Sequence, residues 1–150
     1  MAELTTSSIV VDAEPAEVMA AIADFPSYPE WAKGVQEATV LDEGADGRAD
    51  RVFFRLDVAP IKDEYTLAYQ WRGQEQVSWT LVEGRMLRAL DGAYTLRALD
   101  PDEPGARTEV TYRLALDVSI PLIGMLKRKG EKILIDSALR GLKKRVESRR

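Results

Sequence analysis

The sequence predicts an α+β fold: a curved antiparallel seven-stranded sheet wrapped around one long C-terminal helix, with two short helices after the first strand. Apolar residues alternate with a period of two through the middle of the chain, which is typical of strands with one buried face. After Pro121 the period changes to helical spacing. Short turns separate the period-two segments, so neighbouring strands run antiparallel and an amphipathic helix must cover the sheet.

The N-terminal part supplies the first strand and the two short helices. Leu4–Asp12 is rich in Thr and Val, as strands are. Pro15 then occupies the position of a first helical residue, and apolar residues recur at helical spacing up to about Ala23. Phe25–Trp31 contains two prolines, which prevent a regular helix, so we expect a short, kinked helical turn there.

Six further segments alternate with period two. Clusters of Gly, Pro and acidic residues separate them, and Gly73-Gln74 predicts a tight hairpin. Gly92 interrupts one segment and predicts a bulge or a close backbone approach. The expected strands are Val35–Leu41, Arg51–Val58, Lys62–Arg72, Val77–Leu81, Met86–Leu99 and Glu109–Val118.

The last part of the chain predicts one helix from Ile120 to about Glu147, packed across the sheet. Gly124, Gly130 and Gly141 each weaken helix propensity by about 1 kcal/mol, so we expect a helix that is kinked or locally loose but not broken. Two short helices separated by a loop near Gly130 would contradict this expectation. The predicted apolar face comprises Leu122, Ile123, Leu126, Ile133, Leu134, Ala138, Leu142 and Val146.

Composition excludes several classes of protein. The chain has 150 residues, 45% hydrophobic and 31% charged, and we expect residues 1–150 to form a single domain. It has no Cys and no His, which excludes disulfides, thiolate metal sites, Ser-His triads and the usual general base at neutral pH. No apolar run reaches the roughly 20 residues of a membrane span, and the first residues lack a secretory pattern. We therefore expect a cytoplasmic protein without a transmembrane segment.

Charge is distributed unevenly along the chain. From Lys127 to Arg150 there are ten Lys/Arg and three Asp/Glu, a net charge of +7, so the preceding 126 residues carry −11 of the total −4. An acidic body repels phosphate, and we expect no nucleic-acid partner. We interpret the basic segment as the solvated face of the terminal helix, whose C-terminal end favours cations. A weak contact between this basic helix and a membrane surface stays open as an alternative.

No motif for a cofactor or a metal is present, and we expect neither. The glycine turns do not lead into a helix that could hold phosphate, and the carboxylates lack the spacing of a metal-binding loop. No residue is assigned a catalytic role. Charged residues near the strand ends are interpreted as solvated: Arg55, Asp57, Asp63, Glu64, Arg72, Glu83, Arg85 and Arg88.

Aromatic residues are the candidates for a binding site. A curved sheet closed by one helix leaves more volume than the helix fills, so we expect a pocket of a few hundred Å³. Buried phenol and indole groups need hydrogen-bond partners, which a ligand carbonyl or quinone oxygen can supply. The phase of the pattern does not separate pocket residues from core residues. The expected ligand-binding residues are Trp31, Phe54, Tyr65, Tyr69, Trp79, Tyr94, Tyr112, Leu122 and Leu126. We expect the irregular segment around Trp31 to form one rim of the pocket, opposite the start of the terminal helix near Leu122 and Met125.

Four motifs carry a resemblance to a known family over essentially the whole chain: Val11–Val18, Asp24–Trp31, Trp79–Gly84 and Leu90–Leu96. With the order of elements described above, they resemble the START-like superfamily, whose fold is called the helix-grip fold. Within it, the chain resembles the polyketide cyclase/dehydrase branch, close to the coenzyme Q-binding group. The superfamily includes lipid carriers, hormone receptors and aromatase/cyclases, so the resemblance implies a cavity and not a reaction.

The first functional hypothesis is reversible binding of a hydrophobic or amphipathic small molecule, such as a polyketide, quinone or lipid, in a cavity under the terminal helix. The alternative is an enzyme of the polyketide cyclase/dehydrase type, in which Tyr or Arg polarises a carbonyl of a cavity-bound chain. A third is an interaction or membrane-surface module that uses the basic helix. Ligand identity, protein partners and oligomeric state stay open.

Overall fold

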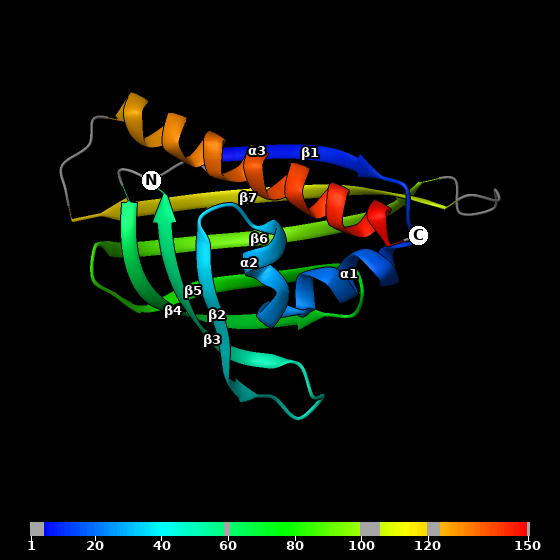
Figure 1. Ribbon diagram of the computed structural model, residues 1–150, viewed down its shortest axis with the longest axis horizontal. Coiled ribbons are helices and arrows are strands. Elements are labelled where there is room, and N and C mark those ends of the chain that lie inside the picture. The colour runs from blue at the N-terminus through cyan, green and yellow to red at the C-terminus, as the bar shows by residue number, and fades with distance from the viewer. Residues whose placement is uncertain (1–4, 59–60, 100–105, 120–123, 150) are drawn as a thin grey trace.

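A computed structural model describes residues 5–58, 61–99, 106–119 and 124–149 (Figure 1). In these residues the chain forms seven strands, three α-helices and one 3-10 turn, Phe25–Ser27. The α-helices are α1 (Pro15–Ala23), α2 (Tyr28–Trp31) and α3 (Gly124–Ser148). The strands are β1 (Thr5–Val11), β2 (Val35–Glu43), β3 (Ala49–Val58), β4 (Ile61–Arg72), β5 (Gln76–Gly84), β6 (Leu87–Leu99) and β7 (Arg107–Val118). This confirms the expected α+β helix-grip fold.

The sheet is antiparallel throughout, in the order β1-β7-β6-β5-β4-β3-β2. Strands β2 to β7 follow one another as a meander, and β1 pairs with β7 from Thr5↔Leu114 to Val11↔Thr108. The turn between β4 and β5 takes residues 73–75, one more than expected, and Gly73 adopts a φ of +54°. Each strand therefore presents its apolar side to one concave face.

Helix α3 lies across β1 and β7, and Figure 1 shows α1 and α2 beside its C-terminal half. Its buried residues, Ile135, Leu139, Leu142 and Val146, recur at helical spacing and face the sheet. The helix continues through Gly130 without a break, as one long helix. The expected start at Ile120 lies outside the described residues.

The buried face of α3 differs from the predicted one, since Ile135 and Leu139, which were not expected in it, are 0% and 2% exposed. Ile133, which was expected in the apolar face, is 52% exposed, whereas Glu131 is only 2% exposed. The Glu131 carboxylate accepts hydrogen bonds from Thr5 Oγ1 at 2.6 Å and from the backbone N–H of Leu116 at 2.8 Å. A buried carboxylate with two donors thus ties the helix to β1 and β7.

The expectation that Asp63 is solvated is wrong. Its side chain, on β4, is 3% exposed and accepts four backbone hydrogen bonds of 2.8–3.1 Å. The donors are the N–H groups of Glu64, Arg85, Met86 and Leu87. Arg85 and Met86 form the connection between β5 and β6, and Leu87 is the first residue of β6. Asp63 supplies the acceptors that close this connection.

Candidate functional site

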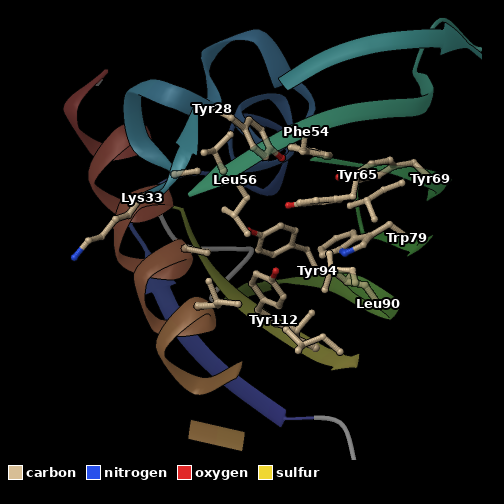
Figure 2. Close-up of a pocket in the computed structure, with 18 of the residues that line it drawn as sticks. Tyr28, Lys33, Phe54, Leu56, Tyr65, Tyr69, Trp79, Leu90, Tyr94 and Tyr112 are labelled. Atoms are coloured by element: carbon tan, nitrogen blue, oxygen red, sulfur yellow. The ribbon is translucent and has the colours of Figure 1, made fainter. Parts of the chain in front are cut away.

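An apolar cavity lies between the concave face of the sheet and α3 (Figure 2). Its volume is about 110 Å³. An engineered apolar cavity of about 150 Å³ in another protein holds benzene, so this one has room for a group the size of one ring. Ala32 and Lys33 on one side and Leu134 and Ala138 of α3 on the other belong to its lining. Because Lys33 is exposed, the cavity opens to solvent between these two sides.

Seven of the nine expected ligand-binding residues line the cavity: Trp31, Phe54, Tyr65, Tyr69, Trp79, Tyr94 and Tyr112. Leu122 and the side chain of Leu126 lie outside the described part of the chain. The structure adds Tyr28 and Lys33, which precede and follow Trp31, and the helix residues Leu134 and Ala138. Leu134 and Ala138 were part of the predicted apolar face, but the spacing did not show which of its residues border a void.

The aromatic residues gather because they face one another across neighbouring strands. Tyr69 pairs in register with Trp79, and Tyr94 pairs with Tyr112. Their ring centroids lie 5.6 Å and 4.6 Å apart, and Trp79 links the two pairs at 5.4 Å from Tyr94. Aromatic pairs at these distances contribute about 0.5–1.5 kcal/mol each beyond their burial. The concave face thus carries a continuous aromatic wall from β4 to β7.

Gly92 fixes the position of the Trp79 indole in this wall. The two residues are partners across β5 and β6, and the ladder shows no register shift there. A Cβ built on Gly92 would lie 2.5 Å from the indole ring. Of the two expectations for Gly92, a bulge or a close approach, the structure therefore shows the close approach. The Trp79 ring lies directly against the Gly92 backbone.

Four tyrosine hydroxyls face the cavity without a partner in the described part of the chain. The Tyr28 hydroxyl differs, because it donates to the carbonyl oxygen of Ile22 at 2.5 Å. Among the described residues, no hydrogen bond satisfies the hydroxyls that remain, those of Tyr65, Tyr69, Tyr94 and Tyr112. Figure 2 shows the hydroxyls of Tyr65, Tyr94 and Tyr112 pointing into the cavity. These hydroxyl oxygens are not enclosed, because the buried side-chain polar atom without a partner among the described residues is Arg113 Nε. The hydroxyls are therefore free to donate a hydrogen bond to an acceptor that enters the cavity.

Burial raises the pKa of all five tyrosines of the chain above the usual value of about 10. The Tyr112 phenol, close to the others, raises the pKa of Tyr28, Tyr65 and Tyr94 further. At neutral pH these groups are therefore neutral hydrogen-bond donors. A phenol that keeps its own proton cannot take one from a substrate, so these groups do not act as general bases at neutral pH.

We expect the tyrosines to ionise only as the protein unfolds. Above pH of about 10 the unfolded chain loses phenol protons that the folded chain keeps. The stability that the five phenols contribute is therefore fully present below a pH of about 10 and is lost as the pH rises towards their folded pKa. Tyrosinate absorbance and circular dichroism, followed through an alkaline titration, should change together. Ionisation near the ordinary pKa with the circular dichroism unchanged would contradict this assignment.

Charged groups are almost excluded from the cavity. Among the lining residues that the structure describes, Lys33 is the charged one. Arg55 and Arg85 are exposed and pair with Glu37 and Glu64, at 3.4 Å and 3.6 Å. In the described ranges no three acidic side chains come together as a metal site requires. The cavity can therefore bind apolar groups and hydrogen-bond acceptors, but its described lining holds no carboxylate that could abstract a proton.

The rim around Trp31 lies against the second half of α3, whereas Leu122 and the side chain of Met125, which were expected opposite it, lie outside the described part of the chain. A Cβ built on Gly141 would lie 2.2 Å from the carbonyl oxygen of Trp31. One turn further along α3, Arg145 Nη1 donates to Glu30 Oε1 at 2.7 Å. The reason is the direction of α3, which follows β7 and runs back across the sheet, so that its end and not its start meets α1 and α2.

The fold and the cavity define a START-like helix-grip protein. The chain belongs to the family described as polyketide cyclase / dehydrase and lipid transport, whose profile matches residues 1–147. Comparison with curated protein sequences finds no match. In the described residues, no helix is long and apolar enough to cross a membrane.

Solved structures share the fold at low sequence identity. A START superfamily protein from Mycobacterium smegmatis is 19% identical, with a TM-score of 0.90 over 99% of this chain and 100% of that one. The aromatase/cyclase Zhui from Streptomyces sp. R1128 is 15% identical, with a TM-score of 0.79 over 98% and 94%. A protein from Thermus thermophilus is 23% identical, with a TM-score of 0.77 over 97% and 98%. These similarities concern the fold.

Proposed function

We propose that the protein reversibly binds a hydrophobic or amphipathic small molecule that carries carbonyl oxygens. Polyketides, isoprenoid quinones and lipids with an ester or keto group have this chemistry. The observation that carries the proposal is the set of neutral tyrosine hydroxyls that face an otherwise apolar cavity without partners among the described residues. The family description, which names polyketide cyclase, dehydrase and lipid transport, supports a ligand of this class.

The size of the cavity sets how much of the ligand is enclosed. A volume of about 110 Å³ takes one ring or a short chain segment, below the roughly 300–1,000 Å³ of a drug-sized pocket. The rest of a longer ligand extends through the opening beside Lys33, or α3 and α2 move apart to admit it. We expect micromolar-class affinity, about −8 kcal/mol, because the enclosed apolar area is modest.

Binding fits this chemistry better than catalysis. Enolisation at neutral pH needs a base with a matched pKa, and the described cavity lining offers neutral phenols and one exposed lysine. One observation favours the enzyme alternative: the hydroxyls of Tyr65, Tyr94 and Tyr112 point into the cavity (Figure 2). A hydroxyl in this position can donate a hydrogen bond to an oxyanion formed on a bound ketone. Incubation with poly-β-ketone mimics and quinones, read by chromatography, decides between the two. A cyclised product that disappears in Tyr65→Phe or Tyr94→Phe would establish the enzyme.

The direct test of binding is identification of what the protein carries. Native mass spectrometry of freshly purified protein should show a copurifying small molecule. Titration with 2-methyl-1,4-naphthoquinone should quench tryptophan fluorescence saturably, because Trp79 and Trp31 line the cavity. The absence of a copurifying molecule together with unsaturable quenching would overturn the proposal.

Trp31→Ala should weaken quinone binding more than it lowers stability. The indole is partly buried, and its ring centroid lies 4.7 Å from that of Tyr28 at the cavity rim. We expect about a tenfold loss of affinity and about 1 kcal/mol of stability. Trp71→Ala is the matched control, because Trp71 is also partly buried but is not in the cavity lining. It should lower the melting temperature and leave affinity unchanged. A large melting loss with unchanged affinity for Trp31→Ala would make Trp31 a core residue.

A further inference from the structure

The outer surface of α3 carries cations without acidic partners. Lys129, Arg140 and Lys144 are exposed, and within the described residues none of them forms an ion pair. Four other cations of this helix have described side chains. Arg128 is also exposed and forms no ion pair among the described residues, whereas acidic side chains neutralise the other three. The pairs are Lys132–Asp136 at 3.2 Å, Lys143–Glu147 at 2.7 Å and Arg145–Glu30 at 2.7 Å.

Lys129, Arg140 and Lys144 lie on one face of the helix together with an exposed apolar residue. Ile133, 52% exposed, follows Lys129 by four residues and precedes Arg140 and Lys144 by seven and eleven. Such spacings place residues on the same side of an α-helix, here the side opposite the buried residues. We call Lys129, Ile133, Arg140 and Lys144 the basic face. It extends about 22 Å along α3 at 1.5 Å per residue.

The basic face shares α3 with part of the cavity lining but occupies a different side of the helix, because consecutive helical residues do not face the same side. Leu134 and Ala138, which line the cavity, are on the same helix, and Leu134 directly follows Ile133. Lys33 lines the opening from the other side. Figure 2 shows its ammonium group pointing away from the cavity towards solvent, and it forms no ion pair among the described residues.

We propose that the basic face docks on an anionic lipid bilayer, with Ile133 at headgroup level. This inference rests on the proposed function, because a hydrophobic ligand must be taken from, or returned to, an apolar phase. The charge of +7 on residues 127–150, against −11 on the rest, makes the chain a dipole that orients at a negative surface. Ile133 favours a bilayer over a purely polar polyanion, since its apolar side chain gains only where acyl chains are near.

Vesicle flotation with the full chain tests the proposal. We expect binding to phosphatidylcholine vesicles that contain about 30% phosphatidylglycerol, and none to pure phosphatidylcholine. Raising salt from about 50 to about 300 mM should weaken the binding at least several-fold through screening. Arg140→Glu combined with Lys144→Glu should weaken it more than about tenfold, since each Lys or Arg near an anionic surface contributes about fivefold.

The matched control is Arg72→Glu combined with Arg88→Glu. These arginines are exposed and without ion pairs in the described residues, but they belong to β4 and β6. The control changes net charge equally and should keep vesicle binding within about threefold of the wild type. Equal losses in both double variants, or no binding of the wild type at low salt, would overturn the docking surface. Quinone titration without vesicles tests the cavity separately. If the quinone does not bind, the proposed function is overturned. If the quinone binds but the protein does not bind vesicles, only the docking proposal is overturned.

Discussion

Asp63→Ala should lower the free energy of unfolding by about 3–5 kcal/mol, the largest effect we expect from one polar side chain. The substitution removes the acceptor of four backbone N–H groups, of which that of Leu87 is fully buried. A hydrogen bond to a charged group contributes about 1.5–3 kcal/mol, and a buried donor left without a partner costs about 1–3 kcal/mol. The expected loss is smaller than four such hydrogen bonds would give, because water can replace the carboxylate at the donors near the exposed Arg85. Urea denaturation measures the change.

Two further variants make the Asp63 experiment specific. In Asp63→Asn one oxygen remains, but the amide N–H₂ faces donors, so we expect about half of the loss. Asp57→Ala removes an exposed carboxylate from the end of β3 and should change stability by less than about 0.5 kcal/mol. A loss below about 1 kcal/mol in Asp63→Ala would show that water replaces the carboxylate at the β5–β6 connection.

Asp63 also shows where sequence reasoning fails. Alternation of apolar residues predicted six of the strands and the concave face, because one-sided burial leaves a period of two within each strand. The first strand was predicted from its Thr and Val content. Three of the four donors to Asp63 lie 22 to 24 residues further on, around the connection between β5 and β6, and no local pattern reveals their N–H groups. Glu131 was missed for the same reason, since its donors come from β1 and β7. Polar side chains acquire their role from tertiary contacts that periodicity does not encode.

The candidate site was predicted in part for a similar reason. Phe54, Tyr65, Tyr69, Trp79, Tyr94 and Tyr112 were found because they occupy the buried phase of their strands. The contact between Trp31 and Gly141 was not predicted, because helical spacing gives a buried face but not the direction in which the helix crosses the sheet. Ile133 was predicted in the buried face because its spacing from Leu126 is helical, but its side chain is 52% exposed. Helical spacing alone does not show whether the sheet covers a given apolar residue.

Gly141→Ala should destabilise the protein by about 1–3 kcal/mol, although alanine is the better helix former by about 1 kcal/mol. The added Cβ would lie 2.2 Å from the Trp31 carbonyl oxygen, and this neighbour is backbone, which cannot rotate away. Either α2 or α3 must shift, so the contact between Glu30 and Arg145 and the cavity rim are displaced with it. We therefore expect weaker quinone binding as well as a lower melting temperature.

Gly130→Ala separates this packing effect from helix propensity. Gly130 is in the same helix, and a Cβ built there meets nothing within 4 Å. Alanine at this position should raise stability by about 1 kcal/mol and leave quinone affinity unchanged. Thermal unfolding and quinone titration of both variants are then read against each other. If Gly141→Ala were stabilised to the same extent as Gly130→Ala, α2 would not be held against α3 in solution. The cavity rim would then be an open edge of the fold, and not the fixed wall that the contact between Trp31 and Gly141 defines.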